Sequence, residues 1–387
     1  MNDISENQPW RRGFWALVVT QFQGAFNDNG LKQLVVFLIL GMAVQQADRD
    51  RLVLVVGALF SAPFILFSMT GGFLADRFSK RSVTIGTKFL EMAVMSVAIL
   101  GLARQSLGLE MAAVFLASTQ GALFGPSKYG LLPELLPEPR LSWGNGVIEL
   151  GTFLAVIAGG VSGGFLADHF QGRQGWSGAI FLALSVLGLV FSLGITRVPP
   201  ADPTKKFRAN PLGDLWTQGK IIRKDRVLWL AVLGNTYFWF LGALLTANII
   251  FYGSDVLHIS SLQTGILQAA VAIGIGLGSL AAGYLSGGKV EYGLIPLGAV
   301  GMTVFGVLLS LHALSFNRVL GLLAALGFAA GFFAVPINAL IQHRPNEKDK
   351  GGVIAAANLL SFVGIGAASG VYYAFQHSLH LSPPAIF

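Results

Sequence analysis

The chain has 387 residues, of which 53% are hydrophobic and only 12% are charged. A soluble domain carries about 25% charged residues, so this chain has too few charges to cover a soluble surface. It contains no cysteine, which excludes disulfides and thiolate chemistry within the sequence. The composition therefore indicates a polytopic helical membrane protein, and an all-α fold is expected.

Eleven apolar segments follow one another along the chain, each about long enough to cross a bilayer. The residues before them, 1–12, are polar. They are not expected to form a cleavable signal peptide, because the first apolar segment is too long for a signal core. The predicted spans are residues 14–44, 51–75, 82–104, 109–136, 142–168, 177–197, 226–255, 262–286, 292–313, 318–342 and 350–378.

The basic residues predict the orientation of these spans. If the N-terminus is cytoplasmic, the inside segments hold most of the 26 Lys and Arg residues, as the positive-inside rule requires. The same distribution accounts for the net charge of +7 by topology, so nucleic acid is not expected as a partner.

Short motifs repeat along the chain and divide it into halves. The sequence GFLAD at 72–76 recurs at 164–168, and a shift of about 210 residues relates 125–128 to 335–338. We expect a six-helix half at 1–200, a cytoplasmic linker at 201–225 and a second half at 226–387. By this shift the twelfth helix would begin near residue 387, so it is expected to be missing, either through shortening or because the chain is part of a longer fusion. Such repeats are typical of secondary transporters, which bind substrate between halves.

An acid lies in the middle of the first span, where Asp28 stands between Asn27 and Asn29. A carboxylate inside a membrane is costly unless it faces a partner or water, so Asp28 is a candidate functional residue. Lys32 lies four residues on, on the same helical face, and could pair with it as a structural alternative. Gln21 extends the same face.

The other intramembrane charges belong to spans 3 to 5 of the same half. We predict that the substrate is bound by Asp28, Asn27, Asn29, Lys32, Lys88, Glu91, Lys128, Tyr129 and Glu149. The alternative is a neutral ion network that fixes packing. Spans of the second half carry charges only at their ends. A charged wall facing an apolar wall suits an amphiphile with a polar head group.

The segment between spans 2 and 3 reads Gly72-x-x-x-Asp76-Arg77-x-Ser79-Lys80-Arg81. It resembles the signature of the major facilitator superfamily, with Ser79 in place of a glycine. The predicted gating residues are Gly72, Asp76, Arg77, Lys80 and Arg81. Asp76 could close the cytoplasmic face by lying at a helix N-terminus, and Gly351-Gly352 is the expected partner. Alternatively, the basic residues only set the topology.

Several stretches resemble the bacterial lysophospholipid transporter family of that superfamily. They are residues 21–29, 125–130 (GPSKYG), 145–149 (NGVIE) and 331–340. The resemblance implies a flippase-like transporter of the bacterial inner membrane. It would move lysophosphatidylethanolamine and lysophosphatidylglycerol from the outer to the inner leaflet, where an acyltransferase–acyl-carrier-protein synthetase, fused or separate, reacylates them. It also implies Asp28 and Lys128, then Glu149, as substrate-binding residues.

Two other functions remain open from the sequence. One is a proton-coupled exporter of small amphipathic compounds, with Asp28 as the proton carrier. The other is a membrane anchor for an acyltransferase. The chain itself lacks a P-loop and an acyltransferase His-x-x-x-x-Asp motif, so no catalytic residue, metal site or cofactor is predicted.

Overall fold

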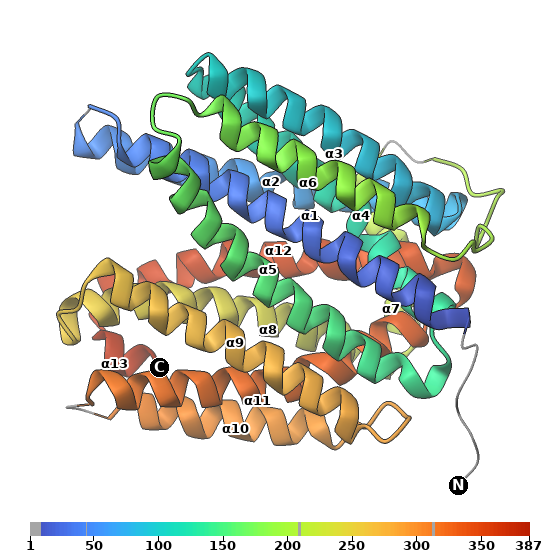
Figure 1. The fold of residues 1–387 in the computed structure, drawn as a ribbon. Coiled ribbons are helices and arrows are strands. Elements are labelled where there is room, and N and C mark those ends of the chain that lie inside the picture. The colour runs from blue at the N-terminus through green and yellow to red at the C-terminus, as the bar shows by residue number, and fades with distance from the viewer. Residues whose placement is uncertain (1–8, 44, 208–209, 312–313) are drawn as a thin grey trace, which may run out of the picture.

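The computed structural model describes residues 9–387 except 44, 208–209 and 312–313. The described residues form two helix bundles joined by a linker (Figure 1). The first bundle contains α1 (Pro9–Leu40), α2 (Gln46–Arg77), α3 (Lys80–Ala103), α4 (Leu107–Leu135), α5 (Leu141–His169) and α6 (Gly175–Leu193). The second contains α8 (Arg226–Phe251), α9 (Ser261–Leu285), α10 (Leu294–Leu309), α11 (Phe316–His343) and α12 (Lys350–His377).

Shorter elements connect these helices. The linker holds α7 (Pro211–Lys224), which the sequence analysis did not predict. The 3-10 turns Glu138–Arg140 and Glu347–Asp349 precede α5 and α12, and the π turn Tyr252–Val256 extends α8. After α12 the chain continues into α13 (Pro383–Ile386). Each of the eleven predicted spans overlaps one of the helices α1–α6 and α8–α12, so the all-α prediction is confirmed. Residues 44 and 312–313 of the predicted spans lie outside the described residues.

Within the described residues, nine helices are long and apolar enough to cross a membrane. The apolar helix α10 is shorter, with 16 residues. Helix α1 is not among the nine, and Asp28 and Lys32 lie near its middle. Large apolar side chains such as Leu54 and Val161 stay exposed on the outside of the bundles, which is where lipid would cover them. The protein is therefore a multi-pass membrane protein.

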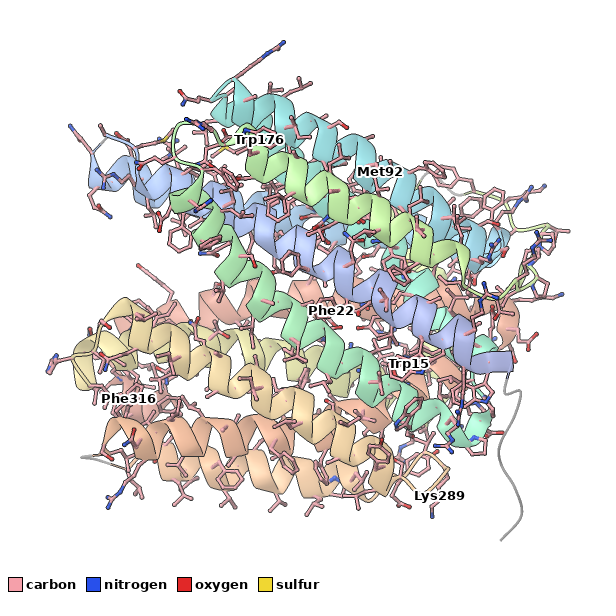
Figure 2. The ribbon with its side chains drawn as sticks, viewed as in Figure 1. Trp15, Phe22, Met92, Trp176, Lys289 and Phe316 are labelled. Atoms are coloured by element: carbon pink, nitrogen blue, oxygen red, sulfur yellow. The ribbon has the colours of Figure 1, made fainter. Side chains whose placement is uncertain are left out.

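The helices run alternately in opposite directions, so their ends gather at two faces (Figure 1). We call the face that holds α7 and the first residues of α1 the linker end, and the opposite face the far end. Exposed tryptophans mark both: Trp15 lies toward the linker end and Trp176 at the far end (Figure 2). Tryptophan at two levels is typical of the two interfaces of a membrane.

The two bundles meet through small residues toward the linker end. A Cβ atom on Gly72 of α2 would lie 2.8 Å from the Gly351 carbonyl oxygen of α12. One on Gly146 of α5 would lie 2.4 Å from the Ser279 carbonyl oxygen of α9. Since such contacts leave no room for a side chain, the helix backbones touch, and this seam closes the linker end.

Candidate functional site

A cavity of about 220 Å³ lies between the two bundles, above the closed seam. It is lined by α1, α2, α4 and α5 from the first bundle and by α8, α11 and α12 from the second. Of the predicted substrate-binding residues, it exposes Asp28, Asn29, Lys128, Tyr129 and Glu149. In the part of the chain that the structure describes, no three His, Asp or Glu side chains gather as a metal site requires.

Asp28 faces this cavity from α1. Among the described residues its buried Oδ1 atom accepts no hydrogen bond, and its other carboxylate oxygen points toward Gly121 of α4. Lys32 does not form an ion pair with it in the described structure. The Lys32 ammonium donates to Asn29 Oδ1 at 3.3 Å and lies 4.4 Å above the Phe60 ring. The alternative of an Asp28–Lys32 structural pair is therefore not realised, and Lys32 does not line the cavity.

Lys128 faces the cavity from α4. Its ammonium lies 4.3 Å from the centre of the Tyr129 ring and makes no hydrogen bond or ion pair with the described residues. Gln120 lies two turns earlier on α4 and also lines the cavity, and its buried Nε2 atom has no hydrogen-bond partner among the described residues. Gln120 was not predicted from the sequence. Its spacing of eight residues from Lys128 is the signal that could have found it.

Glu149 of α5 forms the floor of the cavity, on its linker side. Its Oε1 atom accepts hydrogen bonds from the Tyr129 hydroxyl at 3.3 Å and from Asn338 Nδ2 at 3.2 Å. Asn338 belongs to α11, so this bond joins the two bundles. One helical turn nearer the linker end, Asn145 and Gln342 exchange two amide hydrogen bonds of 3.0 and 2.7 Å.

The wall contributed by the second bundle is neutral. Asn235 donates to the Ser361 hydroxyl at 2.8 Å, and Trp239 lies beside them. Toward the far end, Phe362 of α12 stacks on Phe64 of α2 with ring centres 4.1 Å apart. The charged side chains that line the cavity, within the described residues, thus all come from the first bundle.

Lys88 and Glu91 lie outside the cavity, in the interior of the first bundle. Both side chains are fully buried, and their charged groups are 2.6 Å apart. Gln23 bonds to both, and Asn27 donates to Glu91 Oε1 at 3.0 Å. Ser185 of α6 donates to the same oxygen. The structure therefore does not bring Lys88, Glu91 or Asn27 to the cavity with the other predicted residues, because their polar groups are used within the bundle.

Asp76 lies at the closed linker end and is fully buried. Its two carboxylate oxygens accept hydrogen bonds from the backbone N–H groups of Gly351 at 2.7 Å and Gly352 at 3.0 Å. These groups begin α12, so the expected contact across the bundles is present. Lys205 of the linker completes the arrangement with an ion pair of 2.6 Å. Lys205 was not predicted from the sequence, since nothing in a linker sequence shows where it folds back.

The predicted basic gating residues stabilise the first bundle and the linker. Arg77 donates to the Lys205 carbonyl, and buried Lys80 pairs with Glu134 of α4. Arg81 donates to the carbonyls of Leu193 and Ile195 at the end of α6. Of the five predicted gating residues, Gly72 and Asp76 thus reach the second bundle directly.

Comparisons with known proteins place this fold and cavity in a family. The Major Facilitator Superfamily matches residues 17–369. The lysophospholipid transporter LplT of Enterobacter sp. (strain 638) is 30% identical over 358 residues, covering 90% of this chain and 85% of that protein. LplT of Yersinia enterocolitica is 30% identical over 353 residues, covering 90% and 83%. The chain belongs to the LplT family of the Major Facilitator Superfamily. The resemblance read from the sequence is confirmed, and this LplT-family chain is a membrane transporter rather than an enzyme.

Solved structures agree with the fold. The human organic anion transporter MFSD10 (TETRAN) superimposes with a TM-score of 0.80 at 16% identity, covering 98% of this chain and 96% of that one. FucP in the outward conformation gives a TM-score of 0.74 at 13% identity, covering 98% and 95%. At these identities the likeness concerns the fold alone.

Proposed function

We propose that this LplT-family chain carries lysophospholipids between the leaflets of the bacterial inner membrane by alternating access. The observation that supports this most directly is the asymmetry of the cavity. One wall carries Asp28 and Lys128, two charged groups without ionic partners in the described structure, and the opposite wall is neutral. Relatives at 30% identity are named lysophospholipid transporters.

The charged wall suits a zwitterionic or anionic head group. The Lys128 ammonium can bind a phosphate, and the carboxylates of Asp28 and Glu149 can accept from an ethanolamine ammonium. Charge-assisted hydrogen bonds of this kind are about twice as strong as neutral ones. Asn29 adds an amide beside Asp28. These residues bind lysophosphatidylethanolamine and, through its phosphate and hydroxyl groups, lysophosphatidylglycerol.

The acyl chain occupies the aromatic part of the cavity. Phe60 and Phe64 of α2 face Trp239, Phe362 and Ile365 of the second bundle there. An alkyl chain gains about 0.8 kcal/mol for each methylene group that it buries. The substrate thus lies with its head group on the first bundle and its tail between the two.

The closed linker end fits one state of an alternating-access cycle. The halves 1–200 and 226–387 move against one another, and the linker 201–225 joins them. Gly72 and Asp76 hold the linker end shut on α12, while Arg77, Lys80 and Arg81 keep the first bundle and linker in place. With the N-terminus in the cytoplasm, transport runs from the outer to the inner leaflet. There, an acyltransferase–acyl-carrier-protein synthetase, fused or separate, consumes the product.

Leaflet-resolved transport in liposomes tests the proposal. Labelled lysophosphatidylethanolamine is added to one leaflet, and its arrival in the other is followed without any ion gradient. We expect transport by the unmodified chain, and loss of most of it in Asp28→Asn and Lys128→Gln. Lys32→Gln is the matched control, because Lys32 lies one turn from Asp28 and outside the cavity. No transport by the unmodified chain would contradict the proposal.

A proton-coupled exporter of small amphipathic compounds is the second candidate function. The buried Asp28 Oδ1 atom without a hydrogen-bond partner favours it, since a carboxylate that binds and releases protons needs such an open position. An imposed pH gradient separates the two candidates. Gradient-driven movement of amphipathic cations supports the exporter, and gradient-independent movement of lysophospholipid supports the lipid transporter.

A further inference from the structure

Two rungs of hydrogen bonds join α5 and α11 beneath the cavity. On α5 the participants are Asn145 and Glu149, and on α11 they are Asn338 and Gln342. Each pair is four residues apart, so each lies on one face of its helix. Glu149 bonds to Asn338 in the upper rung, and Asn145 bonds to Gln342 in the lower rung. Since α5 and α11 belong to different bundles, both rungs must break before the linker end can open.

The two rungs differ in how accessible they are to a head group in the cavity. In the lower rung the amides of Asn145 and Gln342 are buried, and each both donates to and accepts from the other. Of these two, Gln342 lines the cavity and Asn145 does not. In the upper rung Glu149 and Asn338 both line it. Glu149 Oε1 accepts both of its hydrogen bonds, and its Oε2 atom receives none within the described residues.

We propose that the upper rung is a sensor of the head group. An ammonium group that binds Glu149 from the cavity replaces Asn338 and releases the one hydrogen bond of the upper rung, out of the three in the two rungs. The substrate class is thus a lysophospholipid with a primary amine, and the inference rests on the proposed lipid transport. Glu149 acts here as a specificity-determining residue that couples binding to opening of the linker end.

The physical basis is a difference in affinity between two states. A ligand shifts a conformational equilibrium only by as much as it binds one state better than the other. In the closed state Asn338 occupies Glu149 Oε1, so an ammonium is limited mainly to Oε2. When the bundles part, Asn338 withdraws and both oxygens become available to it. A glycerol head group offers only neutral hydroxyl donors, so it gains less from the freed oxygen.

The lower rung keeps the linker end closed without a substrate. Its two amide bonds lie one turn nearer the linker end than Glu149. Gln342 lines the cavity, but both of its amide atoms are bonded to Asn145, which does not line it. Asp76 on the N-terminus of α12 adds a second closure at the same end. Opening therefore requires both rungs to be released, and an amine head group assists the release of the upper one most.

Cysteine labelling measures this opening directly, because the chain contains no cysteine. Ser142→Cys places a single thiol on α5 in the closed seam. Ser142 is buried, donates to the Lys289 carbonyl of the second bundle at 3.1 Å, and lies against Gly283 of α9. The variant is placed in nanodiscs, where both membrane faces are accessible, and its rate of reaction with a maleimide is measured.

We expect saturating lysophosphatidylethanolamine to raise the labelling rate at least threefold more than saturating lysophosphatidylglycerol does. In a Glu149→Gln background the two lipids should act equally, because the amide still accepts from Asn338 but no longer attracts an ammonium. Asn338→Ala provides a second test without altering Glu149. Its labelling should be faster without lipid, and the difference between the two lipids should disappear.

The labelling rates distinguish failure of the head-group sensor from failure of lipid transport. Equal responses to the two lipids in the unmodified background would overturn the head-group sensor and leave lipid transport standing. So would a preference for the amine lipid that persists in Glu149→Gln. No response to either lipid would overturn both the sensor and the proposed transport.

Discussion

The first bundle contains two groups of intramembrane charges that differ in their surroundings. Lys88 and Glu91 lie between helices, fully buried, with Gln23, Asn27 and Ser185 bonded around them. Asp28 and Lys128 lie on the cavity wall without ionic partners within the described residues. Asp28 follows Asn27 directly in the sequence, yet the two side chains belong to different groups.

This difference separates structural charges from functional ones. A buried ion whose bonding capacity is filled by the protein stabilises packing, and a ligand cannot reach it. A charged group that faces a cavity without a partner destabilises the ligand-free protein, and a ligand that binds to it offsets this penalty. The number of partners, more than the residue type, therefore distinguishes the two roles.

The largest effect is expected from disrupting the buried Lys88–Glu91 group, whose hydrogen-bonding capacity is filled by the protein. Lys88→Met leaves Glu91 as an uncompensated buried charge, which destabilises a protein by about 3–5 kcal/mol. Thermal unfolding in detergent should show a much lower midpoint and reduced amounts of folded protein. The double variant Lys88→Met with Glu91→Gln should recover part of this loss, since no unpaired charge remains. A single variant as stable as the unmodified chain would show that the group does not fix packing.

Asp28→Asn should lower transport rather than stability. Transport of lysophosphatidylethanolamine should fall by about tenfold or more, because a charge-assisted bond to the head group contributes about 1.5–3 kcal/mol. The unfolding midpoint should stay the same or rise, since a buried carboxylate without a partner is removed. Both quantities are measured on the same preparation. If Asp28→Asn lowered the unfolding midpoint as much as Lys88→Met, the two groups of charges would not differ in role.

Asp76→Asn tests a carboxylate that accepts hydrogen bonds from the N-terminus of α12, in the opposite bundle. The amide keeps one acceptor for α12 but loses the ion pair with Lys205, so the linker end should open more often. We expect maleimide labelling at Ser142→Cys to rise about tenfold, the effect of about 1.4 kcal/mol. Asp168→Asn is the matched control, because Asp168 ends the same GFLAD motif at the far end of α5. Equal effects of the two substitutions would contradict a closing role for Asp76.

The smallest effect is expected at the half-exposed pair of Asp225 and Arg344. Asp225 accepts from the backbone at the start of α8, and the hydrogen bond from Arg344 holds the pKa of its carboxyl below its usual value. A lowered pKa in the folded state stabilises the protein above the unfolded pKa of about 3.9, and this stability is lost as pH falls through the folded pKa. Unfolding midpoints measured from pH 7 to pH 3 should fall slightly less in Asp225→Asn. An identical pH dependence in both proteins would show that the pair contributes nothing.

The sequence predicted the helices and the membrane class well because apolar length is a strong local signal. All eleven spans coincide with helices in the described part of the chain. Helix α7 was missed, since its 14 residues are amphipathic rather than apolar. It packs against α8, which follows it directly, and against α2 and α12, which are distant in sequence.

The candidate site could be predicted only in part, because helical spacing fixes which residues share a face but not what that face meets. Asp28, Lys128 and Glu149 do line one cavity. Lys88 and Glu91 have the same residue types and similar depth, yet α6 covers them with Ser185. Lys205 and Gln120 were not recognised, since their significance depends on tertiary contacts.

The glycine seam has a kinetic consequence. At Gly72 and at Gly146 the opposing helix backbone approaches closely, and the side chains nearest to Gly72 and Gly351 are the short Ala355 and the hydrogen-bonded Asp76. Separation there can proceed without rotamer rearrangement, so the seam itself adds little resistance to it. The barrier then resides in a few polar bonds whose strength charge and ligand can change. We therefore expect the rate of opening at this end to respond more to changes in these hydrogen bonds than to changes in the buried area.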